Sequence, residues 1–268
     1  MQVFQSDWRD APVMIGDESV FAIGDVHGCA DHLECLLKDL AEFASQTKPS
    51  RLVFLGDMIS KGPESLKSLE LWASEDLSTR FDQVHRLYGN HEQFLILVTE
   101  QWPNADEAMR AWSDAGGDVF LEELRRMAGR NGAELSQDLL QDTTSLAVQR
   151  VLKQLVGHVQ IGNLIFVHGG IDPALGVKAS LQAPYYQIGG NHWAWIKAPF
   201  LRHVGGFGDL LIIHGHTVPA QHRELSGQPD PHVLEYGRLS LDGGSTLTGT
   251  VMAAQFETGR YRLIYAQT

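Results

Sequence analysis

The chain has 268 residues, 43% of them hydrophobic, and its 33 Asp and Glu against 21 Lys and Arg give a formal net charge of −12. This length allows one large α/β domain or two small ones, and the hydrophobic content supports a substantial core, which excludes a disordered chain. The acidic balance argues against broad attraction to nucleic acid or to an anionic membrane, so a phosphate group has to be held by local charges.

The cysteines and the N-terminal segment predict a cytoplasmic protein. Cys29 and Cys35 are expected to share one helix, so they form neither a disulfide framework nor a CxxC metal pair. Residues 1–10 lack the apolar core of a signal peptide, and no stretch approaches the roughly 20 apolar residues that span a bilayer. We also find no basic stripe with interleaved aromatic residues, so neither nucleic acid nor membrane is an expected partner.

Strand-like and helix-like segments alternate in the N-terminal part of the chain. An apolar run at 20–23 predicts a buried strand, and the spacing of the leucines after it predicts a helix with Asp31 as its N-cap. The same unit recurs with a strand at 52–55 and a helix from 66 to 72, and a third strand is expected at 84–88. This alternation predicts a largely parallel sheet with the connecting turns at its carboxyl edge.

The middle and the end of the chain differ in character. Residues 94–155 have a mostly helical pattern, whereas strand signals dominate from 158 onward and Gly162-Asn163 is typical of a hairpin turn. No repeat or linker divides the sequence. We therefore expect one domain over residues 1–268, with a helical insertion at about 94–155.

Five short blocks carry side chains that bind metal ions. Each combines a carboxylate, amide or imidazole with at least one glycine, and four of the five follow a strand-like stretch, so the ligands are expected on tight turns. The blocks are Gly24-Asp25-Val26-His27-Gly28, Gly56-Asp57, Gly89-Asn90-His91-Glu92, His168-Gly169-Gly170 and Gly215-His216-Thr217. Mixed oxygen and imidazole donors favour Mn²⁺, Fe²⁺ or Zn²⁺ over Mg²⁺ and Ca²⁺. The blocks predict a two-metal site for phosphoester hydrolysis, with Mn as the expected metal and Fe or Zn as alternatives.

These blocks, in this order, resemble those of the calcineurin-like metallophosphoesterases. The first and third blocks are similar to the phosphoprotein phosphatase branch, and most of all to bacterial and phage serine/threonine phosphatases. Trp195-Ile196-Lys197 and Leu241-Asp242-Gly243-Gly244 also resemble late blocks of the bacterial members. The resemblance implies an α/β fold in which two mixed β-sheets are sandwiched between helices, an αββα arrangement with a helical insertion.

The resemblance also implies a role for each block residue. The implied metal ligands are Asp25 and His27 for the first ion, Asp57 as a bridge, and Asn90, His168 and His216 for the second ion. Two such ions activate a shared water for in-line attack, and His91 is the expected general acid for the leaving oxygen. Val218 stands where relatives outside this branch carry a further His, and His214 is expected to support its neighbours or to belong to the core.

The second block departs from the family pattern in two positions. Ser60 stands where the family has an Asp that orients the acid His, and Lys61 stands where it has a phosphate-binding Arg. Lys197 likewise replaces the Arg of a bacterial Trp-x-Arg block. We expect both lysines to bind phosphate as catalytic-site cations, although lysine lacks the planar fork of arginine, so the grip is looser than usual.

Three functions agree with these features. The first is a metal-dependent serine/threonine protein phosphatase with a phosphoprotein substrate. The runner-up is a symmetrical diadenosine tetraphosphatase or dinucleoside polyphosphate hydrolase, because Ser60 and the run Gly62-Pro63-x-Ser65-Leu66 resemble those enzymes and an anhydride needs less help from His91. The third, from another class, is a phosphate-binding protein that keeps its metals without turnover.

Overall fold

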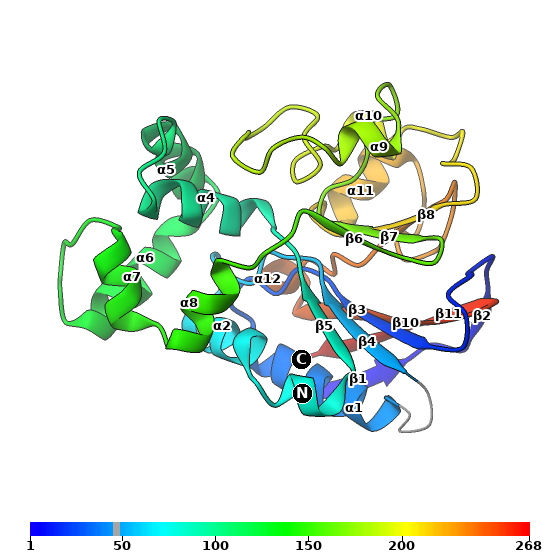
Figure 1. The fold of residues 1–268 in the computed structure, drawn as a ribbon, viewed down its shortest axis with the longest axis horizontal. Helices are drawn as coiled ribbons and strands as arrows, with labels where there is room; N and C mark the ends of the chain where they lie inside the picture. Colours follow the sequence, from blue (N-terminus) through cyan, green and yellow to red (C-terminus); the bar gives the residue numbers. More distant parts are fainter. Residues whose placement is uncertain (45–48) are drawn as a thin grey trace.

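Two β-sheets lie one above the other in the computed structural model, which describes residues 1–44 and 49–268, and helices cover their outer faces (Figure 1). In this part of the chain the first sheet has seven strands: β1 (Gln2–Gln5), β2 (Arg9–Asp10), β3 (Ser19–Ile23), β4 (Ser50–Phe54), β5 (Gln83–Arg86), β10 (Thr250–Glu257) and β11 (Arg260–Gln267). The second sheet has four: β6 (His158–Ile161), β7 (Leu164–Val167), β8 (Leu211–His214) and β9 (Arg238–Ser240). The predicted α/β class with two mixed sheets is confirmed.

The first sheet is parallel on only one side. Strands β3, β4 and β5 pair in parallel, as the alternating pattern predicts. Strand β10, however, runs antiparallel to both β3 and β11, and β1 runs antiparallel to β11. The expectation of a largely parallel sheet therefore holds for the N-terminal strands and fails for the C-terminal hairpin, whose turn contains Gly259 at φ 86°.

The second sheet begins with the predicted hairpin. Strands β6 and β7 are antiparallel around Gly162, which has φ 57°, and β7, β8 and β9 are parallel. Apolar side chains of both sheets meet in one buried cluster, among them Val20, Val53, Phe166 and Ile213. This interface brings the ends of β3 and β4 close to those of β7 and β8.

The helices of the described residues are short and lie outside the sheets: α1 (Ala30–Phe43), α2 (Ser65–Ala73), α3 (Leu77–Arg80), α4 (Asn90–Thr99), α5 (Ala105–Asp114), α6 (Gly117–Ala128), α7 (Gln137–Thr143), α8 (Leu146–Leu152), α9 (Val177–Ser180), α10 (Ala198–Leu201), α11 (Pro219–Ser226) and α12 (Ser245–Thr248). The N-cap prediction for α1 was wrong, because Cys29 holds that position. Asp31 lies in the first turn, where its carboxylate accepts a hydrogen bond from Lys67 Nζ at 2.6 Å.

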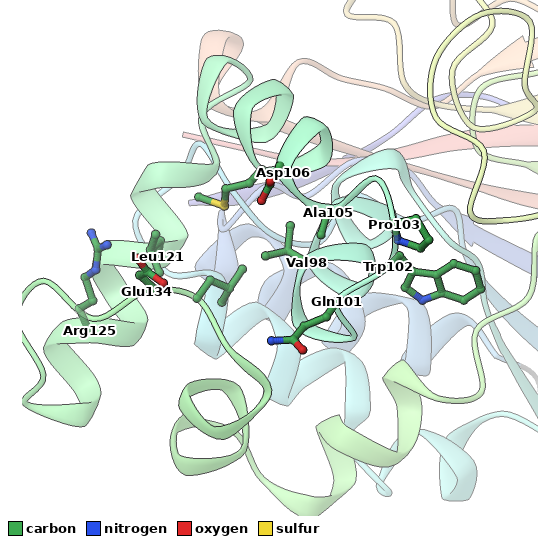
Figure 2. A pocket seen from close by; sticks show the side chains of 11 residues that line it. Val98, Gln101, Trp102, Pro103, Ala105, Asp106, Leu121, Arg125 and Glu134 are labelled. Atoms are coloured by element: carbon green, nitrogen blue, oxygen red, sulfur yellow. The ribbon is translucent and has the colours of Figure 1, made fainter.

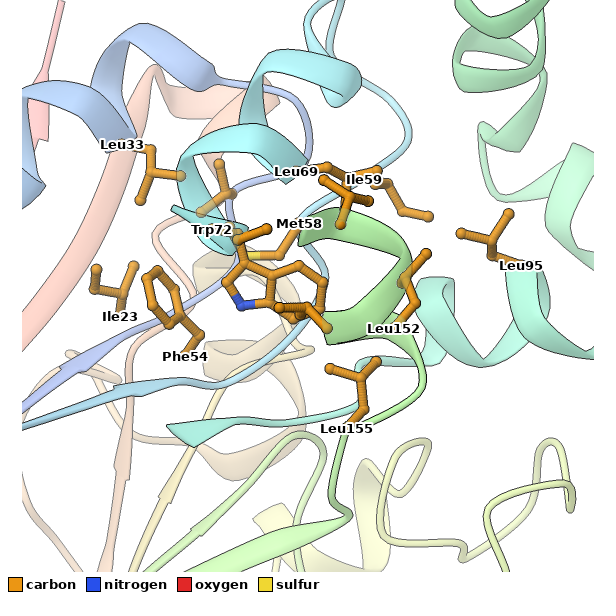
Figure 3. Close-up of a cluster of buried hydrophobic side chains, with 14 of the residues drawn as sticks. Ile23, Leu33, Phe54, Met58, Ile59, Leu69, Trp72, Leu95, Leu152 and Leu155 are labelled. Carbon is orange, nitrogen blue, oxygen red and sulfur yellow. The ribbon is translucent and has the colours of Figure 1, made fainter. Parts of the chain in front are cut away.

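Helices α4 to α8 form the predicted helical region and gather at one side of the sheets (Figure 1). They share a core with the first sheet: Trp72 of α2 is fully buried among side chains that include Phe54, Leu69 and Leu152 (Figure 3). Because this core is continuous, it supports the single domain over residues 1–268, which stays a prediction. Among the described residues, no helix has both the length and the apolar character needed to cross a bilayer.

Candidate metal centre

The predicted ligands lie on turns that follow strands of both sheets. Asp25 follows β3, Asp57 follows β4, Asn90 opens α4 after β5, His168 follows β7 and His216 follows β8. All of these residues except His216 are buried; Asp25, for example, is 1% exposed and His168 is fully covered. The structure therefore brings all six predicted metal ligands to one place, where the edges of the two sheets meet.

Unusual backbone conformations aim these side chains. His27, Asp57 and His216 have φ values of 48°, 56° and 68°, in the left-handed region that non-glycine residues rarely adopt. Each such residue costs about 1 kcal/mol or more, and such strain concentrates at functional sites. The glycines beside them allow close approach, because a Cβ on Gly56 would collide with the Gly89 backbone and a Cβ on Gly215 with the Asp25 carboxylate.

A first group of ligand atoms forms around His27. Its Nδ1 donates to the carbonyl oxygen of Ile59 at 2.9 Å, so the lone pair of the imidazole is on Nε2. That Nε2 lies 3.4 Å from Asp57 Oδ2 and 3.9 Å from Asp25 Oδ2. Two carboxylates and one imidazole thus face each other, in a donor set that suits a divalent ion of intermediate hardness.

A second group shares Asp57 with the first. His168 donates from Nδ1 to the Leu55 carbonyl at 2.9 Å, and its Nε2 lies 3.4 Å from Asp57 Oδ2 and 3.1 Å from Asn90 Oδ1. One ligand atom from each of Asp57, His168 and His216 falls within 4.8 Å of the others. His216 uses Nε2 to bond with the Trp195 carbonyl at 3.1 Å, which leaves Nδ1 for a ligand.

The electrostatics of the cluster also fit bound cations. Burial raises the pKa of Asp25 well above its usual value, and the nearby charge of Asp242 raises it further. Burial also opposes ionisation of Asp57, but the neighbouring His168 and His91 hold its pKa well below the usual value. Buried carboxylates packed this closely are unfavourable unless positive charge compensates them. The side chains present therefore fit a metal-binding role.

Glu92 ties two of the ligand turns together. Its buried carboxylate accepts hydrogen bonds from the backbone N–H groups of Asp57, Met58 and Gly89 at 2.7, 2.8 and 3.0 Å. Burial, with the charge of Asp57, raises the pKa of Glu92 to about 7. The sequence places Glu92 in a block, but its bridging role appears only when the turns after β4 and β5 are seen side by side.

His91 lies against the cluster. Its backbone N–H donates to Asp57 Oδ1 at 3.0 Å, and its Nε2 is 4.0 Å from Asp57 Oδ2. At Nδ1 it accepts a hydrogen bond from the indole N–H of Trp112 at 3.2 Å, and the same N–H donates to Ser60 Oγ at 2.8 Å. Burial holds the pKa of His91 well below its usual value. Trp112 was missed by the sequence reasoning, since it lies in the helical region within no recognisable block.

The two predicted phosphate-binding lysines differ in position. Lys61 Nζ lies 2.7 Å from His27 Nε2, directly at the cluster. Lys197 Nζ donates to Gln221 Oε1 at 3.0 Å. Burial lowers the pKa of Lys197 and the positive charge of Lys61 lowers it further, whereas the carboxylates of Asp242, Asp57 and Asp25 oppose this shift.

Two further residues complete the surroundings. Asp242 is buried and accepts the Gly244 backbone N–H at 2.8 Å; the sequence marked its block but did not name it as a site residue. His214 stands apart from the ligand groups, with its ring stacked on His222 at 5.8 Å and edge-on to Phe200. A core position for His214 is therefore what the structure shows.

A separate cavity of about 580 Å³ lies in the helical region between α4, α5 and α6 (Figure 2). None of the predicted site residues lines it. Apolar and charged side chains both line it, among them Trp102, Asp106 and Arg125. The cavity and the ligand cluster thus share helix α4 but no side chain.

Curated relatives match part of the chain. A symmetrical bis(5'-nucleosyl)-tetraphosphatase of Pseudomonas fluorescens is 28% identical over 160 residues, which cover 60% of this chain and 45% of the relative. An enzyme of the same name from Chromobacterium violaceum is 29% identical over 147 residues, or 51% of this chain and 49% of the relative. The chain therefore spans about half the length of the curated relatives it matches.

Solved structures share the fold. A cold-active protein-tyrosine phosphatase of a psychrophilic Shewanella species superimposes with a TM-score of 0.58 at 20% identity, over 92% of this chain and 78% of that one. A protein serine/threonine phosphatase of Saccharomyces cerevisiae gives a TM-score of 0.51 at 12% identity, over 94% of this chain and 80% of that one.

The calcineurin-like phosphoesterase family matches residues 19–243, a span that contains every predicted metal ligand. This match supports the predicted enzyme class, a metal-dependent phosphoric ester hydrolase. The order of the five blocks, the two stacked sheets and the family match agree, and the chain belongs to the calcineurin-like phosphoesterase family.

Proposed function

We propose that this protein is a metal-dependent phosphoester hydrolase with a two-ion centre. Asp25, His27 and Asp57 would hold one ion, and Asp57 with Asn90, His168 and His216 would hold the second. The observation that carries this proposal is that Asp57 faces both groups of ligand atoms, because its Oδ2 lies 3.4 Å from His27 Nε2 and 3.4 Å from His168 Nε2. The mixed oxygen and imidazole donors suit Mn, Fe and Zn. We propose Mn, with Fe or Zn as alternatives.

When bound, such ions lower the pKa of a coordinated water and neutralise charge on phosphoryl oxygens. The remaining tasks belong to the protein's own side chains. Lys61 and Lys197 supply positive charge beside the cluster, and both bind phosphate as point charges rather than as planar forks. His91 is held by its backbone bond to Asp57, with Nε2 facing the carboxylates.

The proposed substrate is a dinucleoside polyphosphate, such as diadenosine tetraphosphate. Ser60 supports it, because this hydroxyl accepts from Trp112 at the position where the family pattern has a carboxylate for the acid His. When a phosphoanhydride is hydrolysed, the leaving group is a stable phosphate anion. Its departure depends less on a strong general acid than the departure of a seryl oxygen does. The similarity to bacterial symmetrical bis(5'-nucleosyl)-tetraphosphatases also supports this substrate class. A phosphoserine or phosphothreonine protein is the second candidate, favoured by the wording of the first and third blocks.

The test compares two substrates in one preparation. Mn²⁺-loaded protein is assayed for kcat/KM on diadenosine tetraphosphate and on a phosphothreonine peptide, with a chelated sample as blank. We expect faster hydrolysis of the tetraphosphate and no turnover after chelation. His168→Ala should abolish activity, whereas His158→Ala, which alters a residue outside the cluster, should preserve it. Preference for the peptide would overturn the substrate, and full activity of His168→Ala would overturn the metal centre.

A further inference from the structure

Trp112 makes the contact on which this inference depends. It lies on α5, is fully buried, and its indole N–H is shared between Ser60 Oγ at 2.8 Å and His91 Nδ1 at 3.2 Å. An indole nitrogen donates hydrogen bonds and accepts none. His91 Nδ1 must therefore present its lone pair to Trp112, and this nitrogen carries no hydrogen in the arrangement observed.

The hydrogen of the imidazole is consequently fixed on the other nitrogen. A neutral imidazole carries one N–H, and the bond made at one ring nitrogen decides where it is. With Nδ1 accepting, the hydrogen is on Nε2, the atom that lies 4.0 Å from Asp57 Oδ2. His91 thus turns a hydrogen-bond donor toward the cluster. A carboxylate in place of Ser60 would do the opposite, since it would accept from Nδ1–H.

Packing keeps Trp112 in this position. Its ring stacks on Phe94 at 6.4 Å and meets the edge of Phe120 at 6.2 Å. Gly117 leaves room for it, because a Cβ there would collide with the indole ring. Ser60 is also fixed, as its backbone N–H donates to Ser65 Oγ at 3.0 Å. Packing among α4, α5 and α6 therefore fixes the position of the Trp112 indole that donates to His91.

We infer that Trp112 is a positioning residue that holds His91 as an Nε2–H donor and so selects leaving groups that need no proton. The inference rests on the proposed hydrolase function and deepens its substrate class. In hydrolysis a bond forms from a water oxygen to phosphorus, and the bond to the leaving oxygen breaks with its electron pair. A phosphate or aryl leaving oxygen keeps that pair as a stable anion, so His91 only has to donate a hydrogen bond. An alkyl oxygen has to receive a proton.

The direct test reads the tautomer of His91 without reference to activity. Long-range ¹H–¹⁵N correlation spectra of histidine-labelled, metal-free protein should show His91 with its hydrogen on Nε2. In Trp112→Phe we expect this preference to be lost, with a population protonated at Nδ1. Trp102→Phe is the matched control, because Trp102 is in the same region but lines the separate cavity (Figure 2). A hydrogen on Nδ1 in the wild type, or an unchanged tautomer in Trp112→Phe, would overturn the inference.

A second variant covers the case in which Trp112→Phe does not fold. Ser60→Asp adds an acceptor for Nδ1–H and should move the hydrogen of His91 to Nδ1. It should also lower the ratio of kcat/KM for an aryl phosphate to that for an alkyl phosphate by about tenfold or more, since general acid catalysis contributes at least that much. An unchanged tautomer and ratio in Ser60→Asp would contradict the inference. If the spectra show Nε2–H but no phosphoester is hydrolysed, the positioning role stands and the proposed function fails.

Discussion

The turns at the strand ends and the helical region contribute to the metal centre in different ways. The turns carry the proposed ligands, and each ligand sits next to a glycine; at Gly56 and Gly215 that glycine allows another turn of the site to approach closely. The helical region provides Trp112, which reaches His91 across 21 positions of sequence. Ligand chemistry is thus encoded locally in short blocks, whereas the environment of His91 depends on how α4, α5 and α6 pack. We infer that the turns provide the metal-dependent chemistry. The helical region then influences which phosphoesters are hydrolysed.

The largest effect is expected at the residue that both ligand groups share. Asp57→Asn keeps an oxygen that can accept the His91 backbone N–H but removes the charge. Turnover should fall about a thousandfold, because the stabilisation that bound metal provides is worth several kcal/mol. Metal content after dialysis should fall as well. Asp76→Asn removes a carboxylate that pairs with Arg80 on the surface and should leave both quantities unchanged. Normal turnover in Asp57→Asn would show that the metal ligands on these turns are not needed for hydrolysis.

A second prediction tests whether Glu92 supports metal binding in addition to the stability of the fold. Glu92→Gln places an amide against three backbone N–H donors, and we expect it to lower the free energy of unfolding by roughly 1.5–3 kcal/mol. Glu123→Gln is the matched control. The Glu123 carboxylate also accepts backbone hydrogen bonds, from the N–H groups of Ser65 and Leu66 at 2.9 and 3.2 Å, but neither of these residues is a proposed ligand. Both variants should unfold at lower urea concentration. Metal affinity measured by calorimetry should fall only in Glu92→Gln, and an equal fall in both would show that Glu92 has no special link to the centre.

A third prediction concerns the cation beside the turns. Lys61→Met removes the ammonium group that lies 2.7 Å from His27 Nε2. We expect kcat/KM for a phosphoester to fall about tenfold, as befits the loss of one charge-assisted hydrogen bond to phosphate. Lys67→Met is the control, because Lys67 pairs with Asp31 at 2.6 Å on the outer surface. Identical kinetics in the two variants would mean that Lys61 does not bind substrate.

Features that depend on a few neighbouring residues were predictable from the sequence. The turns at the strand ends belong to this class. Strand, glycine and ligand follow one another within a few residues at Asp25 and Asp57, so the position of each ligand follows from local rules. The hairpin at Gly162 was predicted for the same reason, because a turn needs only its own residues and two flanking strands. The helical character of the region after Asn90 also follows from local spacing.

Long-range packing was not predictable from one sequence. The antiparallel pairing of β10 with β3 joins segments more than two hundred residues apart, and no local pattern sets it. Trp112 reads as an ordinary core aromatic until α5 is placed beside the turn that carries Ser60. Glu92 likewise shows three partners only after two parallel strands align their ends. These three features therefore depend on contacts between segments that are distant in the sequence.

The smallest predicted effect lies outside both regions, in the helices that cover the second sheet. His222 of α11 is buried, and its pKa is lowered to about 4, first by burial and then by the positive charges of Arg238, His232 and Arg223. Its ring also stacks on His214.

Because an unfolded histidine has a pKa near 6.5, the unfolded state binds more protons than the folded state between pH 6.5 and about 4. The contribution of His222 is therefore present above pH 6.5 and is lost as the pH falls, by on the order of 1 kcal/mol at pH 5. Urea unfolding of the chelated protein at pH 7 and pH 5 should show a smaller loss for His222→Gln than for the wild type. His27 and His216, whose pKa values burial also lowers, are present in both proteins, so an equal loss in the two would show that His222 does not contribute to the acid sensitivity.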